Sequence, residues 1–139
     1  MTFSIEMGIP ETAELWESLI AKFEEGTLDG EETRFLKKLQ KGVLLLAQNP
    51  SHPGLASHEI KTLTERCKEK VFQSYLENNT PAAARMFWVY GPGQGVITII
   101  GVEAHPEPGT RSYKRVTLSS KKPPAKGKGP TADPKKRRR

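Results

Sequence analysis

The chain contains very little cysteine and histidine for its 139 residues. Cys67 is the only cysteine, which excludes an intramolecular disulfide, and nothing indicates a cross-linked secreted scaffold. The histidines stand at positions 52, 58 and 105, without the close paired spacing of a zinc site. We therefore expect no metal, no cofactor and a reducing, cytoplasmic environment.

Long hydrophobic runs are also missing. No run approaches the roughly 20 apolar residues that cross a bilayer, and the first residues show neither the basic nor the apolar segment of a signal peptide. Hydrophobic residues make up 35% of the chain, which is enough for one modest core. We expect a single soluble domain that does not associate with a membrane.

Positive charge is distributed unevenly along the chain. The formal net charge is +6, but residues 119–139 hold nine Lys or Arg against one Asp, a net of +8 that leaves the preceding body at −2. Prolines and glycines interrupt this stretch and no apolar periodicity crosses it. The sequence predicts a domain over residues 1–118 and a disordered basic tail over residues 119–139. The tail can bind nucleic-acid phosphates non-specifically, or it can serve only as a solubilising terminus.

Two helices are predicted in the first half of the chain. Apolar residues recur at helical spacing over residues 15–23 and again over residues 35–46. Asp29 and Glu32 have the spacing of a capping box at the start of the second helix. The Pro that follows Asn49 requires that helix to end.

Strand patterns dominate the remainder of the body. We predict short strands near residues 3–5 and 71–76, and a last edge strand at residues 116–118. Residues 58–63 fit either a helix or a strand, and we favour a strand. The order of one strand, two helices and then several strands predicts an α+β fold rather than alternating βαβ units.

The most informative stretch is residues 81–105, where two hydrophobic runs flank a Gly-Pro turn. The runs over residues 83–90 and 96–103 predict a β-hairpin. Its glycine-rich turn lacks the Lys-Ser/Thr pair of a phosphate-binding loop and precedes a strand, so we interpret it as a plain hairpin turn. Arg85 begins one strand and His105 follows the other, and these two ends meet in an antiparallel pair.

Arg85 has two readings. Alternation places it on one sheet face with Phe87 and Val89. It can pair with a carboxylate such as Glu103, or its guanidinium can engage a phosphate through two parallel hydrogen bonds. His105 is equally compatible with an ordinary loop residue and with a general acid or base.

Four segments carry a family resemblance: NPSHPGL after the second helix, VFQSYL, the Arg85 strand ARMFWVY, and GVEAHP leading to Tyr113. With the element order over roughly residues 2–118, they resemble the RelE/ParE superfamily of bacterial toxins from toxin-antitoxin pairs. The resemblance implies two N-terminal helices packed on a curved, mainly antiparallel sheet of four to five strands. Many members of this family cut messenger RNA on the ribosome, without a metal.

The resemblance also implies site residues. Arg85 matches the arginine of the family's sheet, His105 falls where the family carries an Arg or His, and Tyr113 falls where many nucleases carry a tyrosine. In RNA cleavage His105 would move a proton, Arg85 would hold the developing negative charge, and Tyr113 would stack on a base or orient the phosphate. Positive charge for RNA binding would come from Lys61, Lys70, Arg111, Lys114 and Arg115.

One departure from the family keeps the function open. Gln73 and Ser74 stand where the ribosome-dependent members carry lysines. The first hypothesis is a toxin that cleaves ribosome-bound messenger RNA and is neutralised by an antitoxin protein. The alternatives are a non-catalytic inhibitor of gyrase, which has the same kind of antitoxin partner, and a non-toxic nucleic-acid or protein interaction module.

Overall fold

The computed structural model describes residues 2–77, 83–104, 113 and 116–121. This part of the chain forms an α+β fold of three helices and one five-stranded sheet, which confirms the predicted fold class. In chain order the elements are β1 (Ser4–Met7), α1 (Glu11–Glu25), α2 (Gly30–Gln48), a 3-10 turn η1 (Pro53–Leu55), β2 (His58–Glu59), α3 (Lys61–Cys67), β3 (Phe72–Tyr75), β4 (Arg85–Tyr90) and β5 (Val96–Glu103).

The sheet has the strand order β1-β5-β4-β3-β2. β1 runs parallel to β5, whereas every other neighbouring pair is antiparallel, so the sheet is mainly antiparallel as predicted. The predicted hairpin is confirmed: β4 and β5 pair from Arg85 opposite Glu103 to Tyr90 opposite Ile97, with one irregularity between Phe87 and Trp88. β4 therefore lies in the middle of the sheet.

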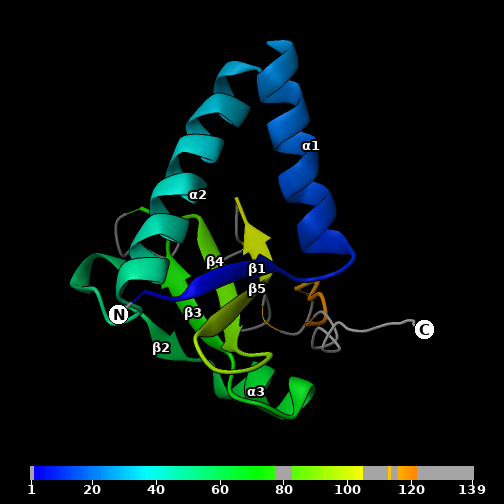
Figure 1. The fold of residues 1–139 in the computed structure, drawn as a ribbon. Helices are drawn as coiled ribbons and strands as arrows, with labels where there is room; N and C mark the ends of the chain where they lie inside the picture. The colour runs from blue at the N-terminus through cyan, green and yellow to red at the C-terminus, as the bar shows by residue number, and fades with distance from the viewer. Residues whose placement is uncertain (1, 78–82, 105–112, 114–115, 122–139) are drawn as a thin grey trace.

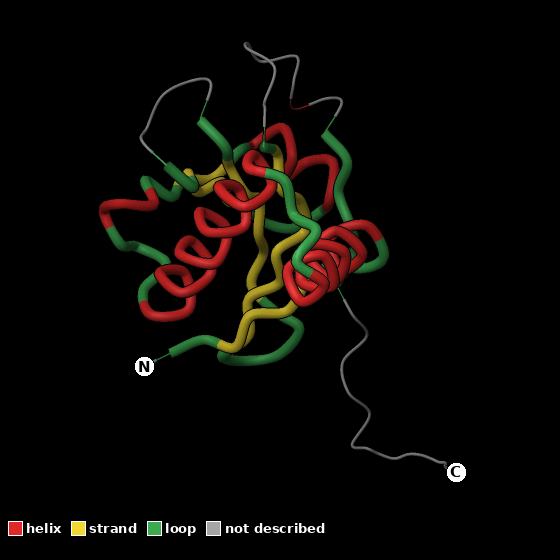
Figure 2. Tube along the Cα trace, turned by 90° about the horizontal axis from the view of Figure 1, so that it is seen from above, coloured by secondary structure: helices red, strands yellow, loops and turns green. Residues whose placement is uncertain are grey.

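The two long helices form a hairpin that stands on one side of the sheet (Figure 1). They meet at their connecting loop and spread apart toward the strands, which are visible between them from above (Figure 2). Gly26 ends α1 in the left-handed conformation, with φ at 73°. Asp29 and Glu32 form the predicted capping box at the start of α2, because each side chain accepts a hydrogen bond from the other residue's backbone N–H.

Two clusters of buried side chains hold the sheet. The larger cluster lies between the sheet and the helix pair and includes Leu19, Leu36, Leu39, Leu46, Met86, Trp88, Ile97 and Ile99. The smaller cluster joins the sheet to α3 and includes Ile60, Leu63, Val71, Phe87, Val89, Ile100 and Val116. Alternate residues of β4 thus point into different clusters, as the pleat requires.

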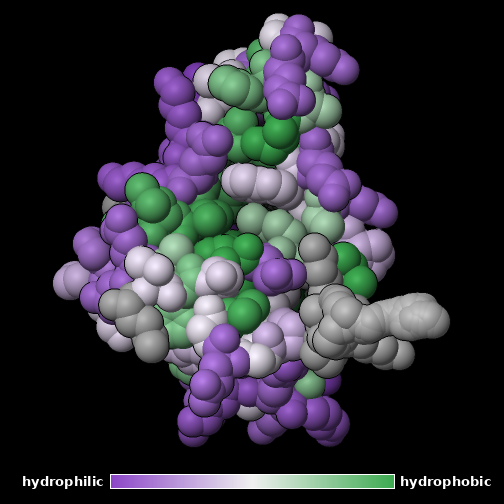
Figure 3. Space-filling view, viewed as in Figure 1, coloured by the Kyte–Doolittle hydropathy of each residue, from purple (hydrophilic) through white to green (hydrophobic). Residues whose placement is uncertain are grey.

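Charged side chains cover much of the outside of the helix hairpin, where Phe23 and Leu44 are also exposed. Figure 3 shows apolar side chains gathered between the lower parts of α1 and α2, with hydrophilic residues on the outer sides. None of the helices in the described ranges has both the length and the apolar character that crossing a bilayer requires.

Two predictions of strands are wrong. Residues 58–63 contribute only the two-residue β2, and α3 begins at Lys61, because Leu63 on that helix turns into the smaller core. The predicted edge strand at residues 116–118 is not a strand. Val116 is buried there as a core residue, and the segment lies near Gly101, where an added Cβ would approach the Thr117 carbonyl to 3.1 Å.

The predicted tail boundary at Ser119 falls inside the packed chain. The Ser119 hydroxyl accepts a hydrogen bond from the Thr12 backbone N–H at 2.9 Å, and Ser120 forms a β-bridge with Ile9. Lys121 forms an ion pair with Glu69. Ser119 and Ser120 therefore dock at the start of α1, and Lys121 docks against Glu69 just after α3. The remaining residues of the predicted tail, 122–139, lie outside the described part of the chain.

Candidate functional site

Arg85 is a buried cation at the start of β4, with a side chain that is 7% exposed. The guanidinium donates from Nε to Glu103 Oε1 at 2.8 Å, and Nη2 lies 2.6 Å from the same oxygen. The two residues face each other directly across β4 and β5. The first reading of Arg85, an ion pair with Glu103, is confirmed.

Tyr113 covers the same guanidinium from a distant part of the sequence. The Arg85 Cζ lies 4.7 Å from the centre of the Tyr113 ring and 5.3 Å from that of Phe87, within the range of cation–π attraction. Arg85 Nη1 also donates a hydrogen bond of 3.3 Å to the Tyr113 hydroxyl. Both aromatic rings belong to the α3 side of the sheet, so the cluster lies on the face opposite the helix hairpin.

Gln73 extends this cluster onto β3. The Tyr113 hydroxyl donates to Gln73 Oε1 at 2.9 Å, which completes a chain of hydrogen bonds from guanidinium to phenol to amide. Gln73 is fully buried, and its Nε2 has no hydrogen-bond partner among the residues that the structure describes. Turning the amide over would exchange its two atoms and still leave one of them unsatisfied.

The Ser74 side chain lies on the opposite face of the sheet. It accepts a hydrogen bond of 2.8 Å from the Trp88 indole and shares one of 2.7 Å with Ser57. Gln73 and Ser74 are therefore both buried, and neither supplies a cation. Gln73 joins the Arg85 cluster, whereas Ser74 is part of the core.

Of the other site residues predicted from sequence, the two that the structure describes are not brought to Arg85. Lys61 and Lys70 are both exposed, at the start of α3 and just before β3. Phe72 at the start of β3 pairs with Trp88, whereas Tyr75 at its end pairs with Arg85. The two lysines thus lie toward the far end of the sheet from the guanidinium. The remaining candidates lie outside the described residues: His105, Arg111, Lys114 and Arg115.

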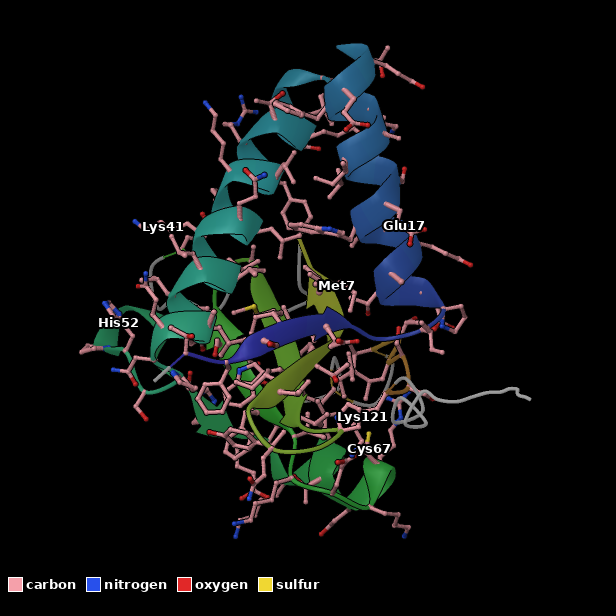
Figure 4. All side chains as sticks on the ribbon, viewed as in Figure 1. Met7, Glu17, Lys41, His52, Cys67 and Lys121 are labelled. Carbon is pink, nitrogen blue, oxygen red and sulfur yellow. The ribbon has the colours of Figure 1, made fainter. Side chains whose placement is uncertain are left out.

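Hollows elsewhere on the described surface do not include Arg85. Two of them lie beside α2, with volumes of about 470 and 320 Å³. The larger is lined in part by Lys41 and His52, which Figure 4 shows on the outer side of α2. Lys38 and Glu77, which form an ion pair, line the smaller one.

Metal ligands are not gathered in the part of the chain that the structure describes. No group of three or more His, Cys, Asp or Glu side chains there is arranged to hold a metal ion. Cys67 lies on α3 beside the smaller core, close to Lys121 (Figure 4), and burial raises the pKa of its thiol. Among the described residues, Glu103 and Tyr113 are titratable groups in contact with the Arg85 guanidinium.

Sequence reasoning missed the role of Gln73, although it noted the residue as a departure from the family. The signal in the sequence was that Gln73 is a polar residue at a strand position that points into the core. A polar side chain is buried at low cost only when it has hydrogen-bond partners. No family model, no curated protein and no solved structure matches this chain, so the family assignment rests on the sequence resemblance.

Proposed function

We propose that this chain is a RelE/ParE-like toxin that cleaves messenger RNA on the ribosome. One observation carries the proposal: Arg85 and Tyr113, which are 28 residues apart in the chain, contact each other on the face of the sheet opposite the helix hairpin. The family resemblance implies that both residues belong to one site. The α+β fold with two N-terminal helices is of the kind that the family resemblance implies.

The chemistry needs three contributions. The RNA 2′-hydroxyl must lose a proton and attack the adjacent phosphate, the pentacoordinate intermediate must be stabilised, and the leaving 5′-oxygen must be protonated. In our proposal Arg85 stabilises the negative charge on the non-bridging oxygens of the intermediate, and Tyr113 stacks on a base or orients the phosphate. His105 takes the proton from the 2′-hydroxyl and delivers it to the leaving 5′-oxygen. Acid-base help of this kind contributes about 10² to 10⁴-fold to the rate.

Such a toxin needs a partner protein. We propose a small antitoxin that binds the chain and blocks RNA from the sheet, and we place both proteins in the cytoplasm. The basic residues after Lys121 then contribute non-specific attraction to RNA phosphates. Removing residues 122–139 should lower RNA affinity, most at low salt, and should leave the position of the cuts unchanged.

The experiment is incubation of the purified chain with translating ribosomes, followed by primer extension on the message. The wild type should give defined cuts, and Arg85→Ala should abolish them. Arg34→Ala, on the exposed surface of α2, removes the same charge elsewhere and should cut like the wild type. Intact message with the wild-type chain would contradict the proposal.

One observation favours a second candidate, the non-catalytic inhibitor of gyrase. Glu103 already forms an ion pair with the Arg85 guanidinium, and the buried Gln73 and Ser74 are uncharged. An inhibitor of this kind would cause DNA damage in cells while leaving messenger RNA intact. The same primer-extension assay, combined with a gyrase supercoiling assay, distinguishes the two candidates.

A further inference from the structure

Glu103 occupies the place where an anionic ligand of Arg85 would bind. Its Oε1 receives both Nε and Nη2 of the guanidinium, at 2.8 and 2.6 Å, which are the two nitrogens that grip a carboxylate or phosphate side by side. The rings of Tyr113 and Phe87 take up the space over the guanidinium. The edge that faces Glu103 is therefore an anion site with a resident carboxylate.

Glu103 is placed so that it can leave this site. It is the last residue of β5, and its side chain is 23% exposed, against 7% for Arg85. Rotation of its side chain toward solvent would leave the backbone ladder between β4 and β5 intact. Arg85, in contrast, is fixed by burial and by the two rings.

Gln73 gives a second, independent indication of a ligand. The side-chain amide of Gln73 accepts a hydrogen bond from the Tyr113 hydroxyl through Oε1. Nε2 belongs to the same amide group and has no partner among the described residues, so its N–H groups lie beside Tyr113 in the Arg85 cluster. Buried amides normally have a partner for each polar atom, and a missing one calls for an explanation. An oxygen of a bound ligand would supply that partner.

Building on the proposed function, we infer that this cluster is an oxyanion site held closed by Glu103 and opened by an RNA phosphodiester. The phosphate displaces the carboxylate from Nε and Nη2 of Arg85, and Gln73 holds the Tyr113 hydroxyl, which contacts the guanidinium at Nη1. A phosphodiester suits this exchange because it carries one negative charge and two free oxygens, as the carboxylate does. Glu103 thereby makes the resting site selective for a ligand that can outcompete an internal anion.

Binding of a fluorescein-labelled 2′-O-methyl hexauridine, followed by fluorescence anisotropy, tests this inference. The missing 2′-hydroxyl prevents cleavage, so the assay reports binding alone. Glu103→Gln keeps a hydrogen-bond acceptor beside Arg85 and removes the competing charge, and it should tighten binding at least about threefold. Gln73→Met keeps the length of the side chain and removes the amide, and it should weaken binding.

Two controls separate the site from general electrostatics. Glu69→Gln removes a comparable, partly exposed carboxylate that is paired with Lys121, and it should change affinity much less than Glu103→Gln. Adding Arg85→Ala to Glu103→Gln should remove the gain. Thermal melting identifies any variant that does not fold, and Glu103→Asp, which withdraws the carboxylate by one methylene, then takes the place of Glu103→Gln with a gain in the same direction.

The outcomes separate this inference from the proposed function. Equal effects of Glu103→Gln and Glu69→Gln, or a gain that survives Arg85→Ala, would overturn the inference even if the wild type cuts messenger RNA. An Arg85-dependent gain together with weaker binding by Gln73→Met would support it even if messenger RNA stays intact on the ribosome. Unchanged binding by Gln73→Met would remove Gln73 from the site.

Discussion

The guanidinium of Arg85 lies 4.7 Å from the ring centre of Tyr113 and also donates a hydrogen bond to its hydroxyl. The same hydroxyl donates a hydrogen bond to Oε1 of the buried Gln73. Tyr113→Phe keeps the ring over Arg85 but leaves the Gln73 amide with neither atom bonded. We expect a loss of about 1–3 kcal/mol in the free energy of unfolding, measured by urea denaturation.

Tyr90→Phe provides the matched control for this change. Tyr90 is 48% exposed, so water can satisfy any group that its hydroxyl leaves behind. The control should change stability by less than about 0.5 kcal/mol. Equal stability of the Tyr113→Phe and wild-type chains would mean that the hydroxyl bridge contributes nothing.

The elements with strong local signals were predicted correctly from the sequence. The helical spacing and the Asp29–Glu32 capping box set α1 and α2, and the turn between two apolar runs set the β4–β5 hairpin. These signals involve residues close together in the chain, so no long-range information was needed. The short α3 was taken for a strand because its seven residues hold too few apolar positions to define a period.

The parts that depend on distant contacts could not be predicted. Ser119 looked like the beginning of a tail because its neighbours are polar and basic, yet its hydroxyl bonds to Thr12, 107 residues away. Gln73 likewise depends on Tyr113, 40 residues further along the chain. The sequence was compatible with Arg85 either in an ion pair or at a phosphate site. The structure shows the ion pair, because strand pairing places Glu103 directly opposite Arg85.

Gly8 is required by the close approach of the chain that follows Leu118. A Cβ at this position would lie 2.7 Å from the Ser119 Cβ and 3.1 Å from the Ile99 and Ser120 carbonyl oxygens. Two of these contacts are with backbone oxygens, so the clash can be relieved only by a shift of the backbone. Gly8→Ala should therefore lower stability by about 1–3 kcal/mol in urea denaturation.

Gly30→Ala is the comparison for that substitution. Its Cβ would meet only the Arg34 Nη1, at an ordinary 3.5 Å, in the first turn of α2. Alanine is also the better helix former, so this variant should be as stable as the wild type or slightly more stable. If both glycine variants behave alike, close packing at Gly8 is not what the position requires.

Asp29 begins α2 through its side chain. It accepts a hydrogen bond of 2.7 Å from the Glu32 backbone N–H, and the Glu32 side chain accepts one of 3.1 Å from the Asp29 backbone N–H. Asp29→Ala should cost about 1 kcal/mol of stability, whereas Asp29→Ser keeps an acceptor and should cost much less. Thermal melts of the two variants check this order, and a reversed order would contradict the capping role.

Cys67 should react slowly with iodoacetamide. The thiolate is the reactive form, and burial raises the pKa of this thiol, so less thiolate is present at pH 8 than in a free cysteine peptide. The raised pKa stabilises the folded state below the unfolded pKa of about 8.5, and that contribution is lost as the pH rises through the folded value. Labelling rates from pH 7 to 10 should rise later for the folded chain than for the urea-unfolded chain, and coinciding profiles would contradict the shift.

The central claim is that Arg85 serves RNA cleavage, and the rate of message cutting on translating ribosomes tests it most directly. Wild-type, Arg34→Ala and Arg85→Ala chains should be compared by primer extension at equal concentration, after circular dichroism has shown that all three are folded. We expect the same cuts and rates for the first two chains and a loss of at least about 100-fold for Arg85→Ala. Intact message with the wild type, or equal cutting by the Arg85→Ala chain, would contradict it.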